Sequence, residues 1–172
     1  MIRGSAGALH IGVIGEGECS ARTAALARRV GAAVAKSGAT LCSGGLGGVM
    51  EAASRGAAEA GGLVVGILPG FSRQEANRWV AVPIVTGMDQ ARNVVLVRSC
   101  DALIAVGGMY GTLSEIALAL KLGVPVVGLG TWRLRQPAGR PVPIIRAATP
   151  EAAVARALRA AKTANRARGA LP

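Results

Sequence analysis

The sequence predicts an α/β fold, and two observations carry that prediction. Short apolar runs alternate with longer Ala-rich stretches whose apolar positions recur with helical periodicity. The apolar runs are continuous, which is typical of strands buried on both faces of a parallel sheet that helices cover on both sides. We therefore predict one doubly wound, Rossmann-like domain with a mostly parallel sheet of six or seven strands.

The elements follow in order from these runs and from the residues that stop them. Residues 9–15 predict a buried strand, and Ser20 is a suitable N-cap for a helix that continues to about residue 36, before Gly38. The other predicted strands cover residues 39–42, 63–68, 82–85, 102–106 and 124–129. The other predicted helices cover residues 49–60, 89–98, 112–122 and 150–164. Residues 131–148 are expected to be irregular; the domain is expected to span residues 1–164, and residues 165–172 to fray.

Composition and charge narrow the functional class. The 172 residues include 34 Ala, 25 Gly and only four aromatic residues, and the formal net charge is +11. The longest apolar run has nine residues, whereas a membrane-spanning helix needs about 20. The last 42 residues carry +8 of the charge but only one aromatic side chain, Trp132, on which a base could stack. This pattern favours a solvated basic helix and argues against nucleic-acid binding as the main function.

The cysteines and the N-terminal residues indicate a compartment. Three cysteines without a CxxC pair and a single histidine give no zinc pattern, so we expect no metal site. Cys42 and Cys100 lie in or beside apolar runs and are expected in the core. No secretory signal fits the first residues, so we expect a cytoplasmic protein with reduced thiols.

Three glycine-rich turns follow predicted strands, at residues 15–17, 44–48 and 107–112. In a doubly wound sheet, the loops after the strands line the ligand crevice, and glycine lets backbone N–H groups face an anion beside a helix N-terminus. The turns therefore predict a phosphate-bearing ligand. No Lys follows a turn as in a P-loop, and the GxGxxG fingerprint with its later acid is absent, which argues against NAD.

Charged residues near the third turn are candidates for chemistry. Glu115 follows Thr112 at capping-box spacing, so its carboxylate either returns to the loop backbone or faces the ligand. Arg92 and Arg98 are six residues apart on one predicted helix and point in different directions, so they cannot share one role. We expect one of the two arginines to face the crevice.

These residues resemble the "lonely guy" (LOG) family and its relatives, once mislabelled lysine decarboxylases. The resemblance covers about residues 9–130 and rests on GGLGGVMEA from Gly44, Ala91-Arg92-Asn93, and GGMYGTLSE from Gly107. It implies a Rossmann-like homodimer. In the founding branch it implies hydrolysis of cytokinin riboside 5′-monophosphates to free base and ribose 5-phosphate, with Arg92 and Glu115 matching the family's arginine and glutamate.

Departures from that branch affect the implied activity. Val106 stands where the founding branch has proline, Asn93 stands where it has lysine, and the third loop has two residues between GG and GT instead of one. This form resembles the branch that contains the molybdenum cofactor carrier proteins, which bind a phosphorylated pterin without needing to hydrolyse it. The extra residue moves the phosphate relative to Glu115, and a displacement of about 1 Å at a reacting centre costs on the order of 100-fold.

Two functions follow from the resemblance. The preferred one is a binder or carrier of a phosphorylated heterocycle, either a nucleotide or the molybdenum cofactor; the alternative is a nucleoside 5′-monophosphate phosphoribohydrolase with Arg92 and Glu115 as catalytic residues. Neither requires another cofactor or a metal. A homodimer through residues 112–122 is expected, and Tyr110, Trp79 and Phe71 are candidates for base stacking, the ligand mouth or a dimer seam. The predicted ligand-binding residues are Gly15, Glu16, Gly44, Gly45, Gly47, Gly48, Met50, Arg92, Asn93, Gly107, Gly108, Met109, Tyr110, Gly111, Thr112 and Glu115.

Overall fold

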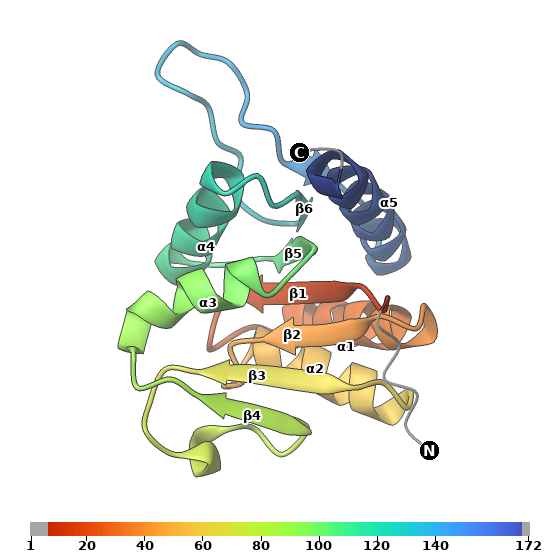
Figure 1. Ribbon diagram of the computed structural model, residues 1–172, viewed down its shortest axis with the longest axis vertical. Helices are drawn as coiled ribbons and strands as arrows, with labels where there is room; N and C mark the ends of the chain where they lie inside the picture. The colour runs from red at the N-terminus through yellow and green to blue at the C-terminus, as the bar shows by residue number, and fades with distance from the viewer. Residues whose placement is uncertain (1–6, 170–172) are drawn as a thin grey trace.

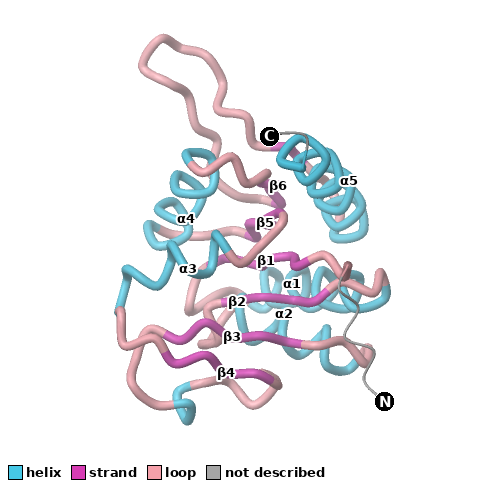
Figure 2. Tube along the Cα trace, in the orientation of Figure 1, coloured by secondary structure: helices cyan, strands magenta, loops and turns pink. Residues whose placement is uncertain are grey.

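The computed structural model describes residues 7–169, which form one sheet with helices on both faces (Figure 1). The strands are β1 (His10–Gly15), β2 (Thr40–Ser43), β3 (Val64–Leu68), β4 (Val82–Val85), β5 (Ala102–Val106), β6 (Val126–Leu129) and β7 (Ile145–Arg146). The helices are α1 (Ala21–Lys36), α2 (Val49–Glu59), α3 (Arg92–Arg98), α4 (Tyr110–Lys121) and α5 (Pro150–Gly169). Short 3₁₀ helices, η1 (Arg73–Glu75) and η2 (Asp89–Ala91), precede β4 and α3 (Figure 2). The α/β prediction is confirmed.

The strand order explains where a crevice forms. The order is β4-β3-β2-β1-β5-β6-β7, and every pairing is parallel. The chain builds outward from β1 to β4, returns to the centre at β5 and builds outward on the other side. At such a reversal, the loops after the two central strands leave for opposite faces and open a crevice between them. Gly15 pairs with Val106 in register, so the loops after β1 and β5 start side by side.

Separate groups of helices cover the two faces of the sheet. Side chains of α1, α2 and α5 pack on one face with Ile11 and Val13 of β1, and side chains of α3 and α4 pack on the other face with Ile14. In Figure 1, α1 and α2 lie behind the strands. This arrangement follows from the alternation of side chains along a strand, which sends neighbouring residues of β1 into different cores.

The helices α1 and α2 cross in backbone contact. A Cβ at Gly31 of α1 would lie 1.9 Å from the carbonyl oxygen of Ala53, and a Cβ at Gly56 of α2 would lie 1.9 Å from the carbonyl oxygen of Arg28. Each helix therefore has a glycine at the point where the other helix presents its backbone. Replacing either hydrogen by a methyl group requires the two helices to separate, since a carbonyl in a helix cannot turn aside.

Several boundaries differ from the sequence prediction, among them the following. The segment expected to be irregular, residues 131–148, contains β7, which pairs with β6 through Ile145 and Arg146. Helix α5 continues to Gly169, past the expected boundary at 164, and the Nδ2 of Asn165 donates to Oδ1 of Asp101 at 2.9 Å, which ties its last turns to the start of β5. The last three residues, 170–172, lie outside the described range. Helix α4 begins at Tyr110, two residues earlier than expected.

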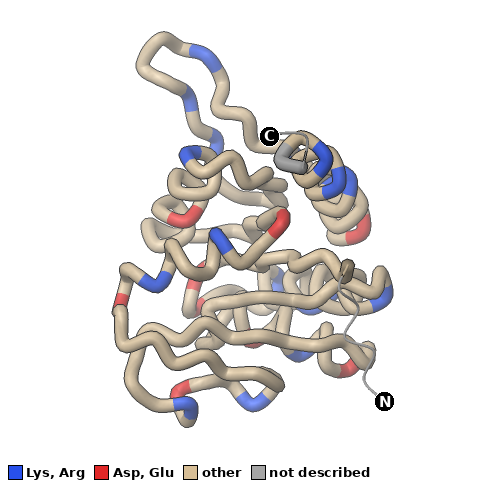
Figure 3. The backbone as a smooth tube through the Cα atoms, in the orientation of Figure 1, with Lys and Arg blue, Asp and Glu red and all other residues tan. Residues whose placement is uncertain are grey.

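The basic C-terminal segment lies on the outside of the molecule. Figure 3 shows Lys and Arg along α5 and on the loop between β6 and β7, which projects from the body of the protein. Among the side chains of α5 whose burial is described, the exposed cations are Arg156, Arg159, Lys162 and Arg166. Within residues 7–169, no helix has the length and apolar character needed to cross a membrane.

Candidate functional site

Glu16, immediately after β1, connects the three glycine loops. Its carbonyl accepts the N–H of Val49 at 3.0 Å, and its carboxylate Oε2 accepts the N–H of Gly108 at 2.7 Å. Gly48, at φ +61°, passes so close that a Cβ there would lie 2.3 Å from the Glu16 carbonyl oxygen. The loops after β1, β2 and β5 therefore meet where the strand order reverses.

The third loop presents unsatisfied hydrogen-bond donors. Gly107 and Gly108 adopt φ values of +59° and +116°, and the side chain of the N-cap Met109 does not cap α4. The first amides of a helix, here those of Tyr110, Gly111 and Thr112, have no acceptor within it. The hydroxyl of Thr112 is buried and has no hydrogen-bond partner. Donors gathered at a helix N-terminus favour the binding of an anion. The N–H of Gly108 is not one of these open donors, because it already donates to Glu16.

The second loop is held by Asn77, from the segment between β3 and β4. Its Nδ2 donates to the carbonyls of Gly45 and Leu46 at 3.1 and 2.9 Å, and its backbone N–H donates to the Gly45 carbonyl at 2.8 Å. On the other side, the N–H of Gly45 donates to the hydroxyl of Ser43. These bonds fix the backbone of the loop independently of a ligand. Sequence reasoning missed Asn77, because nothing local to residue 77 indicates that it reaches the loop.

Arg92 and Glu115 form a buried ion pair between α3 and α4. Arg92 Nη1 and Glu115 Oε1 lie 3.8 Å apart, and each side chain is 9% exposed. Burial raises the pKa of the Glu115 carboxyl to about 7, although the neighbouring Arg92 charge acts in the opposite direction. Burial also lowers the pKa of Arg92, and its Nε and Nη1 have no hydrogen-bond partner. A buried pair with unsatisfied donors is costly, so it needs a reason other than stability.

The structure shows which of these charged side chains turn inward. Arg98 is exposed, while Arg92 points inward and packs against Gly44, where a Cβ would lie 2.6 Å from Arg92 Nη1. Because α4 begins at Tyr110, Glu115 is its sixth residue and pairs with Arg92 rather than with the loop backbone. The capping-box interpretation is therefore wrong.

Two cavities lie on either side of the segment 17–19. The first, of about 660 Å³, lies between the loop after β1 and the start of α4, and is lined by Gly15, Glu16, Gly17, Glu18, Cys19, Ser20, Met109, Gly111 and Thr112. The second, of about 650 Å³, lies between the starts of α1 and α2 and has Trp79 in its wall. Both volumes are typical of small-molecule sites. Arg92 and Glu115 line neither cavity.

The other candidate residues fall into three groups. Gly44, Met50, Arg92, Asn93 and Glu115 are gathered beneath the second loop, where Asn93 Nδ2 donates to the hydroxyl of Ser114 at 3.2 Å. Tyr110 is 76% exposed and lies 6.0 Å from the ring of Trp132, whose Nε1 donates to the Met109 carbonyl. Phe71 is 86% exposed and packs beside Gly87, outside both cavities. The contact between Tyr110 and Trp132 was not predicted, since 22 residues separate them.

The fold and the crevice define a Rossmann-like protein with three glycine loops at its strand reversal. The chain belongs to the SLOG cluster4 family, whose model matches residues 8–154. It is 54% identical over 121 residues to an uncharacterised protein from Archaeoglobus fulgidus, a match that covers 70% of this chain and 80% of that protein.

Similar solved structures include a molybdenum cofactor binding protein and a molybdenum cofactor carrier protein. The molybdenum cofactor binding protein from the phototrophic bacterium Rippkaea orientalis is 36% identical, with a TM-score of 0.81 over 90% of this chain and 98% of that chain. The molybdenum cofactor carrier protein from Chlamydomonas reinhardtii is also 36% identical, with a TM-score of 0.74 over 89% and 98%. DNA processing protein A from Helicobacter pylori, at 18% identity and a TM-score of 0.64, shares the fold alone. The resemblance to the branch with cofactor carriers is confirmed.

Proposed function

We propose that the protein binds and carries a phosphorylated heterocycle of the molybdenum cofactor type in the first cavity. The anionic end of the ligand meets the open amides of Tyr110, Gly111 and Thr112, and the Thr112 hydroxyl donates to it. The observation that carries this proposal is the Thr112 hydroxyl, which is buried beside the cavity without a partner. Buried polar groups are normally hydrogen-bonded, so an orphan at a helix N-terminus indicates a ligand. Similarity to cofactor-binding proteins at 36% identity supports the ligand class.

The position of the ion pair favours carriage over hydrolysis. A carrier needs a cavity with donors for the anion, and it needs no acid or base beside a scissile bond. Arg92 and Glu115 line neither cavity, and each is 9% exposed. General acid–base chemistry requires hydrogen-bond reach to the reacting atoms. The first cavity thus has the donors that an anion needs, while the charged pair of Arg92 and Glu115 lies beneath the second loop.

The test compares the parent chain with Thr112→Val, after both are purified from a host that makes the molybdenum cofactor. Native mass spectrometry is expected to find the cofactor on the parent and several-fold less on the variant. Valine has the shape of threonine, and the buried hydroxyl that it removes has no hydrogen-bond partner within the chain, so the variant should be at least as stable as the parent. A parent that purifies empty and binds no added cofactor contradicts the proposal.

A phosphoribohydrolase is the second candidate, and the titration of Glu115 favours it. A carboxyl whose pKa is raised to about 7 is suited to act near neutral pH, and a perturbed carboxyl beside an arginine is a feature of many active sites. In this reading, Arg92 orients the sugar phosphate and Glu115 stabilises positive charge at C1′ or positions water, as in glycoside hydrolysis. Release of base from AMP or isopentenyladenosine monophosphate by the parent, but not by Glu115→Gln, is the expected result. Equal release by both contradicts it.

The proposed assembly is a homodimer formed through α4. The residues at its start, Met109 and Tyr110, are 61% and 76% exposed, which leaves an apolar surface available for a second copy. Light scattering should give twice the chain mass for the parent and a shift toward the monomer for Tyr110→Asp; a monomeric parent contradicts this assembly.

We propose that the protein acts in the cytoplasm, where cysteines stay reduced, in keeping with the free thiols of Cys19, Cys42 and Cys100.

A further inference from the structure

The second cavity is a built recess with no role in the function proposed so far. It lies between the starts of α1 and α2, and its floor is made of small residues: Ala21, Ala24, Ala25, Gly48 and Ala52. The side chains of this floor are too short to fill the recess. The helices cannot slide together to close it either, because their backbones already touch further along, at Gly31 and Gly56.

The indole of Trp79 forms one wall, and the backbone of Trp79 is held in place from the second glycine loop. The backbone N–H of Trp79 donates to Oδ1 of Asn77 at 3.1 Å, and the Nδ2 of Asn77 donates to the carbonyls of Gly45 and Leu46. The aromatic wall and the glycine loop are therefore one hydrogen-bonded unit. Because the backbone that carries the indole is already fixed, less entropy is lost when a flat ring stacks on it.

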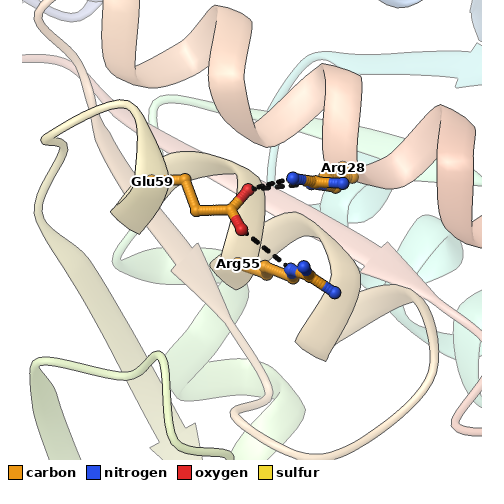
Figure 4. Close-up of polar contacts among 3 residues, drawn as sticks. All are labelled: Arg28, Arg55 and Glu59. Carbon is orange, nitrogen blue, oxygen red and sulfur yellow. Dashed lines mark hydrogen bonds and ion pairs between the residues drawn. The ribbon is translucent and has the colours of Figure 1, made fainter.

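Two arginines border the same cavity, and one carboxylate fixes both. Glu59 accepts hydrogen bonds from Nε of Arg28 at 2.8 Å through Oε2 and from Nε of Arg55 at 2.9 Å through Oε1, as Figure 4 shows. These contacts lower the pKa of the Glu59 carboxyl, so it remains charged at neutral pH. The guanidinium carbons of Arg55 and Arg78 lie over the ring of Trp79, 5.6 and 5.0 Å from its centroid. Glu59 thus keeps a guanidinium donor at the aromatic wall, and a ligand ring that stacks on Trp79 takes the place of one guanidinium there.

Carboxylates supply the complementary acceptors. Glu18 and Glu51 line the cavity together with Arg28 and Arg55. A carboxylate accepts two adjacent N–H groups, and a guanidinium donates to a carbonyl oxygen. A flat ring with amino and ring N–H groups on one edge and a carbonyl beside them satisfies both kinds of partner. Pterin and guanine share this edge, which is that of a 2-amino-4-oxopyrimidine ring, whereas adenine has no carbonyl oxygen.

We infer that the second cavity binds the ring of the ligand, as a 2-amino-4-oxo heterocycle stacked on Trp79. This inference rests on the proposed function, because it assigns the anionic end of the same ligand to the first cavity. The two cavities share the segment Gly17, Glu18 and Cys19, so one ligand lies across that segment with an end on each side. Trp79 is then the residue that binds the ring, and Glu18 and Glu51 select its edge.

The chain offers a direct optical test, because it has only two tryptophans. In a Trp132→Phe background, Trp79 is the sole tryptophan, and its emission reports on the second cavity. The probes are pterin-6-carboxylate, GMP, AMP and ribose 5-phosphate. Pterin-6-carboxylate and GMP should quench the emission saturably, AMP should bind at least about tenfold more weakly, and ribose 5-phosphate should leave the emission unchanged.

Variants separate this inference from the proposed function. In the same background, calorimetry should show that Trp79→Ala weakens GMP binding on the order of 10-fold, the loss typical of a stacked base, and that Trp79→Phe restores most of it. Ribose 5-phosphate should bind Trp79→Ala as it binds the background protein. If GMP binds equally well to both proteins without quenching, the ring site is wrong while the anion site stands. Equal affinities for AMP and GMP overturn the selection by Glu18 and Glu51. If no probe binds, the ring site is wrong, whereas the proposed function is overturned only if the parent also purifies without the cofactor and binds none when it is added.

Discussion

The crossing of α1 and α2 gives a quantitative prediction for Gly56→Ala. The added Cβ would lie 1.9 Å from the Arg28 carbonyl oxygen, whereas ordinary contact begins at 3.4 Å, so the helices must separate by about 1.5 Å. Overpacking of this kind costs about 1–3 kcal/mol and at times more, and alanine returns about 1 kcal/mol of helix propensity. Since the clash is with backbone on both sides, we expect the upper part of that range and a net loss of about 2 kcal/mol.

The assay is thermal and urea unfolding followed by circular dichroism. A loss of about 2 kcal/mol lowers the Tm by roughly 4–8 °C for a chain of this size. Gly111→Ala, also within a helix but with nothing within 4 Å of the new Cβ, is the control and should be at least as stable as the parent. Once Gly56→Ala has parted the helices, adding Gly31→Ala should cost less than it does alone. A Gly56→Ala chain as stable as the parent would refute the close crossing.

Three further predictions concern the loops and the buried pair. Glu16→Gln should tighten binding of inorganic phosphate on the order of fivefold in calorimetry, because it removes a like charge worth about 1 kcal/mol near the anion; unchanged affinity contradicts this. Asn77→Ala should cost about 2–3 kcal/mol in urea unfolding, since it removes three side-chain hydrogen bonds, and it should speed hydrogen exchange in the second loop. Glu115 has a pKa of about 7 when folded against an ordinary 4.5, so its favourable contribution is present below pH 4.5 and is lost as the pH rises through 7. The parent should lose on the order of 3 kcal/mol between pH 4.5 and 7.5 relative to Glu115→Gln, and parallel pH profiles would contradict the shift.

The central strands could be predicted because each is a continuous apolar run between glycines or caps. The N-cap at Ser20 also follows from local chemistry, and its hydroxyl accepts the N–H of Thr23 at 3.1 Å. The two-residue strand β7 could not be found this way, because Ile145 and Arg146 have no pattern of their own and pair only once β6 is in place. Short edge strands depend on tertiary partners that local propensity does not include.

The candidate site was predictable in its loops but not in its side-chain directions. Glycine spacing indicated which backbone segments gather at the strand reversal. It did not indicate that the carboxylate of Glu16 accepts the N–H of Gly108, or that the side chain of Asn77 donates to the second loop. Helical spacing separated Arg92 from Arg98 without deciding which one turns inward, since that choice depends on the packing of α3 against α4.

The contact between Glu16 and Gly108 has a consequence for the third loop. Because the Gly108 amide has an anionic partner within the chain, the turn at Gly107 and Gly108 is anchored to the end of β1. The amides of Tyr110, Gly111 and Thr112 are therefore presented by a backbone that is already fixed, so an anion that meets them has little loop to order.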